Sequence, residues 1–266
     1  MNKSGINIFQ VRYLSLRLIT IFLIELDSKI YFISREDLIM NTYKTPKNID
    51  KWDFENSFYL TCENNRISDF ISHLELYKMI LKLPGDVLEF GVFKGTSLIQ
   101  FLSFREYYEN FESRSIVGFD SFGKFPSDEL KKIDSDQSFA SHHDEDLGYG
   151  ISKSDLDIFL KKKNFSNYSL IRGDILKTLP DYLKNNPEKR FSLIHIDVDV
   201  YEPTKHILEN TWDKIVEGGV LILDDYGTVE GETKAVDEFL HNKNILIQKL
   251  PYKYKPSFII KKTNPI

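Results

Sequence analysis

The sequence predicts an α/β fold with a doubly wound, mostly parallel sheet of seven strands. From residue 86 onward, short apolar runs alternate with longer amphipathic stretches, and most of the apolar runs end in a carboxylate. No internal repeat or low-complexity tract interrupts this alternation, which excludes solenoid architectures. Strands that alternate with helices need crossover connections, and such connections produce parallel sheets covered on both faces.

The elements are expected in a regular order along the chain. Residues 66–83 place apolar side chains at near-helical spacing and stop at Pro84-Gly85, which predicts an amphipathic helix. Further helices are expected at residues 97–108, after Asp174 and from Glu202. The sequence predicts strands at residues 87–90, 116–119, 168–171, 191–196 and 219–223, and a closing pair at 245–247 and 258–260.

The first 60 residues carry no recognisable chemistry, and we expect an N-terminal, largely helical extension at 1–60 followed by a domain at 61–266. The most apolar N-terminal stretch, residues 18–24, is shorter than the roughly 20 residues that cross a bilayer, so no membrane span is expected. No small-residue cleavage site follows it. Met40 is a second candidate start.

Composition excludes several function classes. The chain has 266 residues, a net charge of −5 and no basic patch, so nucleic acid is not an expected partner. It contains one cysteine, Cys62, and therefore no intrachain disulfide and no cysteine cluster for zinc. We expect a cytoplasmic protein. The segment around Trp52 is rich in aromatic residues, and one expectation for it is self-association into a homo-oligomer.

The first motif that carries chemistry is a glycine-spaced turn between a strand and a helix. Glu89, Gly91 and Gly95 form an E-x-G-x-x-x-G pattern, and Thr96 or Ser97 is expected to cap the helix that follows. The pattern differs from the G-x-G-x-x-G of dinucleotide enzymes, so it favours a smaller, carboxylate-bearing nucleoside over a pyrophosphate. The alternative is a purely structural turn.

Two further motifs lie at the expected ends of strands. Asp120 can accept hydrogen bonds from the hydroxyls of a ribose held over the first turn, or it can cap a helix. Two neighbouring strands end in the aspartates Asp197, Asp224 and Asp225. Carboxylates that lie this close to one another need a positively charged partner. Oxygen ligands favour magnesium, manganese or calcium over zinc. Helix capping is the alternative, and we expect His73 and His195 to be core or edge residues.

Together these motifs resemble the macrocin O-methyltransferase family of S-adenosylmethionine-dependent enzymes, which methylate sugar hydroxyls. The similarity runs in order over residues 61 to about 240. The matching pieces are Asn65-Arg66, residues 84–92, Asp120-Ser121-Phe122, Gly173-Asp174, residues 178–180, Asp197-x-Asp199-x-Tyr201-Glu202-x-Thr204, Gly218-Gly219 and Asp224-Asp225-Tyr226. One departure is Val198, where relatives usually carry glycine.

The resemblance implies a methyltransferase domain at residues 61–266 and a sugar or glycosylated small molecule as acceptor. It implies a magnesium ion held by Asp197, Asp224 and Asp225, with Asp197 also similar to the residue proposed in the family as proton acceptor. The implied S-adenosylmethionine site comprises Glu89, Gly91, Ser97, Asp120, Ser121 and Asp174, with Gly95 and Thr96 in the same turn.

We expect residues 123–155 to form a lid that closes the site against water. In that segment His142 or His143 is a candidate general base or substrate contact, and a solvated loop is the alternative. Three other functions stay open: a catechol-type methyltransferase acting on an aromatic diol, a metal-dependent hydrolase, and a non-catalytic nucleoside-binding module.

Overall fold

The computed structural model describes residues 12–16, 19–26, 29–34, 51–125, 136 and 148–262. His142 and His143 lie outside the described residues, as does most of the segment expected to close the site. The chain divides into two units, residues 1–62 and 63–266. In the ranges described, no helix is both long and apolar enough to cross a bilayer.

The described residues of the N-terminal unit form three antiparallel strands and one helix. The strands are β1 (Arg12–Leu16), β2 (Ile19–Leu26) and β3 (Lys29–Ser34), with β2 in the middle. The helix is α2 (Lys51–Thr61). The expected helical extension is therefore helical at α2, whereas its most apolar stretch forms β2. That stretch contains three isoleucines, Thr20 and Phe22, and β-branched and aromatic residues suit a pleated strand.

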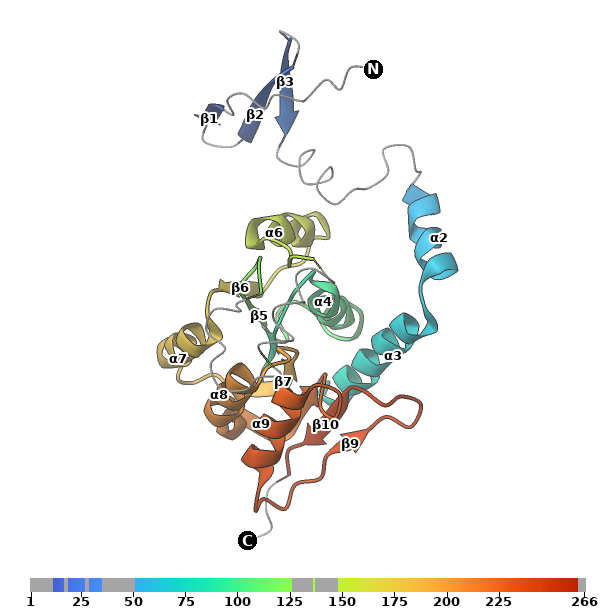
Figure 1. Ribbon diagram of the computed structural model, residues 1–266, viewed down its shortest axis with the longest axis vertical. Coiled ribbons are helices and arrows are strands. Elements are labelled where there is room, and N and C mark those ends of the chain that lie inside the picture. Colours follow the sequence, from blue (N-terminus) through green and yellow to red (C-terminus); the bar gives the residue numbers. More distant parts are fainter. Residues whose placement is uncertain are drawn as a thin grey trace. The chain divides into compact units, whose positions relative to one another are not determined.

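The second unit is built on a seven-stranded sheet in the order β6-β5-β4-β7-β8-β10-β9 (Figure 1). The five parallel strands are β4 (Asp86–Phe90), β5 (Ile116–Asp120), β6 (Tyr168–Arg172), β7 (Phe191–Ile196) and β8 (Ile215–Leu223). The antiparallel strands β9 (Gln248–Lys249) and β10 (Ser257–Ile260) complete one edge. The predicted doubly wound, mostly parallel sheet is confirmed.

Helices cover both faces of this sheet, because neighbouring residues of each strand point to opposite sides. Val87 packs in one core cluster with α3 (Asn64–Met79), α4 (Thr96–Tyr108) and α6 (Lys153–Lys162). Leu88 packs in the other with α7 (Ile175–Asn185), α8 (Tyr201–Thr211) and α9 (Glu230–Leu240). Figure 1 shows α7, α8 and α9 together on one side of the sheet.

The predicted closing strand at 245–247 is wrong. The strand is Gln248–Lys249, while Ile245 and Ile247 pack against the core from the connection before it. Isoleucine favours strands locally, but here Ile245 and Ile247 lie in a loop that runs over the core, and their side chains pack against it. Tertiary packing thus outweighs local propensity at this edge of the sheet.

Candidate active site

A cavity of about 670 Å³ opens at the carboxyl ends of the parallel strands. The chain builds β4, β5 and β6 outward in one direction and then returns to place β7 and β8 on the other side of β4. The strand order therefore reverses between β4 and β7, and ligands of open α/β sheets bind in the crevice at such a point. Residues following β4, β5, β6, β7 and β8 all line the cavity.

Gly91 makes this crevice possible. It has a φ of +88°, and a Cβ at this position would lie 1.7 Å from the carbonyl oxygen of Asp197. The amide of Asp197 also donates to the carbonyl of Phe90 at 2.8 Å. The chain segments that leave β4 and β7 are thus in direct backbone contact, and only glycine fits between them.

Asp120 holds the turn that follows Gly91. Its Oδ2 accepts hydrogen bonds from the amides of Val92 at 2.7 Å and Phe93 at 2.9 Å. Its Oδ1 accepts from the amide of Phe122 at 2.5 Å and from the Ser121 hydroxyl at 3.3 Å. A carboxylate offers about four acceptor positions, so the chain itself uses them all. A ribose hydroxyl would have to replace one of these donors, and the longest bond is that of Ser121.

The structure separates the expected nucleoside-binding residues into two groups. Gly91, Asp120, Ser121 and Asp174 line the cavity, whereas Glu89, Gly95, Thr96 and Ser97 are not among its lining residues. Asp174 is also the N-cap of α7, where it accepts from the amide of Leu176.

The expected side-chain cap of α4 is wrong. The N-cap is Gly95 itself, and the helix has no side-chain cap hydrogen bond at this end. A Cβ on Gly95 would lie 2.8 Å from Leu156 of α6, and its φ is +84°. Gly95 therefore allows the turn to pack closely against α6.

The aspartates after β7 and β8 form an acidic cluster. Carboxylate oxygens of Asp197, Asp199 and Asp225 lie within 4.8 Å of one another. Lys255 reaches this cluster from the segment before β10, with its Nζ 2.5 Å from Asp225 Oδ1 and 3.7 Å from Asp224 Oδ2. Of the predicted trio, Asp197 and Asp225 belong to this cluster, and Asp199 takes the place expected for Asp224.

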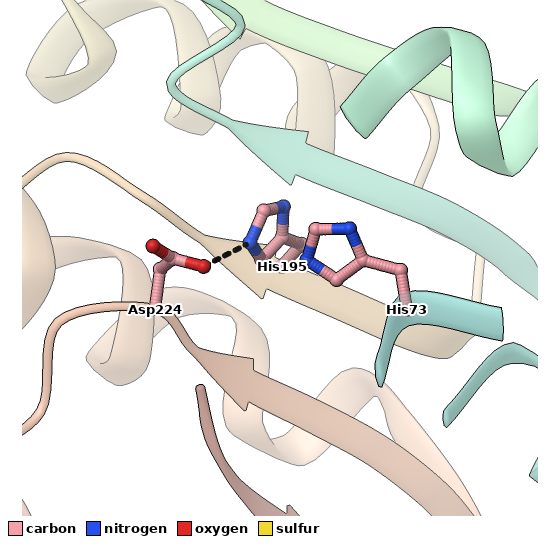
Figure 2. Close-up of side chains that lie close together, drawn as sticks. All are labelled: His73, His195 and Asp224. Atoms are coloured by element: carbon pink, nitrogen blue, oxygen red, sulfur yellow. Dashed lines mark hydrogen bonds and ion pairs between the residues drawn. The ribbon is translucent and has the colours of Figure 1, made fainter. Parts of the chain in front are cut away.

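Asp224 faces a different neighbour. Its Oδ1 lies 3.5 Å from Nε2 of His195, and it forms a second group with His195 and His73. Asp224 and Asp225 follow the end of β8 one after the other, and their carboxylates have different partners. Figure 2 shows the carboxylate of Asp224 and both imidazoles directed toward one another.

Burial and mutual repulsion change the acidity of these groups. Burial, followed by the charge of Asp224, raises the pKa of Asp197 well above its usual value. Burial and the charge of Asp225 do the same to the pKa of Asp199. Burial alone would raise the pKa of Asp224, but the hydrogen bond and charge of His195 outweigh it and lower this pKa to about 2.

The donor set of the acidic cluster fits a hard divalent cation. All its ligand atoms are carboxylate oxygens, which magnesium, manganese and calcium prefer. Burial is the larger cause of the raised pKa values of Asp197 and Asp199, and repulsion between neighbouring carboxylates adds to it. A divalent cation bound there would offset both effects by stabilising the ionised carboxylates.

His73 and His195 are buried, as expected of core residues, but they belong to a polar chain. Nδ1 of His195 lies 3.3 Å from Glu89 Oε1, and Nδ1 of His73 lies 2.7 Å from Gln100 Oε1. Burial lowers the pKa of His73 to about 4. For His195, burial is outweighed by the carboxylates of Asp224 and Glu89, which raise its pKa well above the usual value.

Comparison with known proteins assigns the family. A family model described as Macrocin-O-methyltransferase (TylF) matches residues 59–250. The chain belongs to this family. It is 28% identical over 151 residues to a mycinamicin III 3''-O-methyltransferase of Micromonospora griseorubida, an alignment that covers 54% of this chain and 56% of that protein.

Two further similarities name rhamnose. The chain is 30% identical over 150 residues to an 8-demethyl-8-(2,3-dimethoxy-α-L-rhamnosyl)-tetracenomycin-C 4'-O-methyltransferase of Streptomyces olivaceus, covering 54% of each protein. It thus spans about half the length of these two relatives. It also resembles the apo structure of CalS11, described as a TDP-rhamnose 3'-O-methyltransferase in calicheamicin biosynthesis. The TM-score is 0.61 at 26% identity, over 86% of this chain and 95% of CalS11.

Three residues of this TylF family member were missed as site residues by sequence reasoning. Asp199 could have been found, because it lies two residues after Asp197 in the same acidic motif. It carries the left-handed backbone of this segment, with a φ of +62°, so Val198 needs no glycine-like conformation. Lys255 and Arg66, which also line the cavity, come from distant parts of the chain and have no local signal.

Proposed function

We propose that the chain is an S-adenosylmethionine-dependent O-methyltransferase that methylates a hydroxyl of a sugar or glycosylated small molecule with the help of Mg²⁺. Family membership supports the reaction class. The observation that carries the proposal for this chain is the acidic cluster beside the Gly91 turn, within a single cavity at the strand-order reversal. Residues 61–266 form the methyltransferase domain, with 1–60 as an extension.

S-adenosylmethionine supplies an electrophilic methyl group, so the protein's task is to align an acceptor oxygen and remove its proton. Gly91 and Ser121 border the part of the cavity that takes the nucleoside, while Asp197, Asp199 and Asp225 border the part that takes the acceptor. A divalent cation held by Asp197, Asp199 and Asp225 would make a neighbouring hydroxyl more acidic. Asp197 accepts the proton once its own carboxyl is ionised.

A sugar is favoured as acceptor over an aromatic diol. Two relatives are described by their action on rhamnose-containing molecules, one of them a sugar nucleotide. Arg66 lines the same cavity and is exposed, so its guanidinium is available to a diphosphate group. A panel of TDP-rhamnose, a rhamnosyl glycoside and a catechol, each with labelled donor, separates these acceptors. Methylation of the catechol alone would reject the sugar.

Calorimetry with S-adenosylhomocysteine tests the donor site without any knowledge of the acceptor. We expect one binding event per chain. Undetectable binding at millimolar ligand would instead favour a hydrolase or a binding module of another kind.

The metal and the base are tested by chelation and by Asp197→Asn. We expect chelation to abolish methyl transfer and Mg²⁺ to restore it. Asp197→Asn should lower the rate by about 10²-fold or more, the usual contribution of a general base. Asp181→Asn, an exposed change on α7, is the matched control and should retain full activity. A fully active Asp197→Asn enzyme would refute the role of Asp197.

A further inference from the structure

A second cluster of ligand atoms lies behind the acidic cluster, on the α3 and α4 side of the sheet. It consists of His73 from α3, His195 from β7 and Asp224 after β8, each with one ligand atom within 4.8 Å of the others. His195 is fully buried, His73 is 6% exposed, and the Asp224 side chain is 22% exposed. The group is therefore enclosed but reachable from the cavity through Asp224, which lines it.

The outer hydrogen bonds of both histidines leave Nε2 directed inward. Gln100 Oε1 lies 2.7 Å from Nδ1 of His73, and Glu89 Oε1 lies 3.3 Å from Nδ1 of His195. In His73 this acceptor favours the tautomer with the proton on Nδ1, which leaves the Nε2 lone pair for a ligand. In His195 a metal ion would take the place of the Nε2 proton that faces Asp224. Histidines that bind metals are held in this way by an amide or carboxylate oxygen behind the ring.

Nε2 of His73 is buried and has no hydrogen-bond partner. Such an atom loses its hydration on folding and gains no hydrogen bond in return. Figure 2 shows this side of the His73 ring turned toward His195 and Asp224. An unpartnered acceptor, a second imidazole and a carboxylate thus converge on one point, and a cation at that point would satisfy all three.

We propose that His73, His195 and Asp224 form a binding site for a zinc-class divalent transition metal, distinct from the all-oxygen cluster of Asp197, Asp199 and Asp225. Two imidazoles and one carboxylate are ligands that such metals prefer, whereas magnesium prefers oxygen alone. Asp224 belongs to both sites, with Oδ1 toward His195 and Oδ2 toward Lys255. The site does not depend on methyl transfer.

Titration of the full chain with Zn²⁺, in the presence of saturating Mg²⁺ to fill the oxygen site, tests this proposal. We expect one equivalent of Zn²⁺ to bind wild type and to raise its thermal midpoint. His73→Gln should weaken binding by more than about 100-fold, and Gln100→Ala by about 10-fold through loss of the hydrogen bond behind the ring. His206→Gln, on α8 and away from the cavity lining, is the matched control and should bind as wild type does.

X-ray absorption of the Zn²⁺-loaded chain, or the visible spectrum with Co²⁺, gives the second measurement. Two imidazole ligands are expected in wild type and fewer in His73→Gln. This readout also works without Mg²⁺ and without substrate, so it is independent of whether the proposed function is right. Equal Zn²⁺ affinity in wild type and His73→Gln, an oxygen-only shell, or no binding at all would overturn the proposal.

Discussion

Gly91 is the residue at which the backbones leaving β4 and β7 touch. Its missing side chain leaves room for the carbonyl of Asp197, and its φ of +88° suits glycine. Gly91→Ala therefore adds a left-handed alanine, which costs about 1–2 kcal/mol, and an overpacked contact, which costs about 1–3 kcal/mol. We expect a loss of at least about 2 kcal/mol in the free energy of unfolding and loss of S-adenosylhomocysteine binding, measured by urea denaturation and calorimetry.

Gly123 provides the comparison for this variant. It lines the same cavity, but a Cβ there would meet no atom of the described residues within 4 Å, and its backbone is not left-handed. Gly123→Ala should change the free energy of unfolding by less than about 0.5 kcal/mol, as most unconstrained substitutions do. If Gly91→Ala were equally benign, close contact between the two segments would not shape the site.

Single residues also show what sequence reasoning could reach. Asp120, Asp197 and Asp225 were found because a carboxylate that follows an apolar run lies at a strand's carboxyl end, a property of one short segment. Glu89 follows the same rule, yet its side chain is fully buried beside His195. Lys255 could not be found, because its contact with Asp225 joins residues 30 positions apart through the pairing of β8 with β10.

At the scale of elements, the N-terminus of α8 is capped from a distance. Its own N-cap, Val200, has no side chain able to accept a hydrogen bond, and Asp136 Oδ2 accepts instead from the Tyr201 amide at 2.8 Å. Asp136 is buried in this position. Because α8 follows directly after Asp197 and Asp199, this cap holds the helix against the site.

We expect Asp136→Ala to lower the free energy of unfolding by about 1 kcal/mol, and up to about 2 kcal/mol, the range for loss of a helix cap. Asp136→Asn keeps an acceptor oxygen and should lose less. Ser152→Ala removes the local cap of α6, which accepts from Asp155 at 3.1 Å, and gives a matched reference. A wild-type midpoint in Asp136→Ala during chemical denaturation would show that this bond does not stabilise α8.

The central strands of the sheet were easier to predict than the short strand at its edge. The buried strands β4, β5 and β7 are mostly apolar because helices cover both of their faces, so composition marks them. The short strand β9 pairs only with β10, and its position depends on that pairing rather than on its own residues. Sequence patterns therefore predicted several of the residues that line the candidate site, whereas the contacts that complete its lining come from tertiary structure.

For the whole molecule, the acidic cluster makes stability depend on pH and on metal. Burial and neighbouring carboxylates raise the pKa values of three carboxyl groups, those of Asp197, Asp199 and Glu232. Above pH 4, about the usual pKa of a carboxyl group, the unfolded chain has released these protons while the folded chain retains them. Stability is then lost as pH rises from that value through the folded pKa values. The pKa of Asp224 is lowered to about 2, so between pH 5 and pH 8 this group is ionised in both the folded and the unfolded chain and does not make stability depend on pH.

Metal-free wild type should therefore lose more stability between pH 5 and pH 8 than metal-free Asp199→Asn, which lacks one of these protons and part of the repulsion. Each retained proton changes the free energy of unfolding by about 1.4 kcal/mol per pH unit. In the difference between the two chains, the contributions of His73 and of other groups that titrate equally in both cancel. Mg²⁺ should stabilise wild type most at high pH, where the carboxylates are ionised, and Asp199→Asn less. Thermal midpoints in chelator and in Mg²⁺ measure both effects, and parallel pH profiles for the two chains would show that Asp199 does not contribute to a strained acidic cluster.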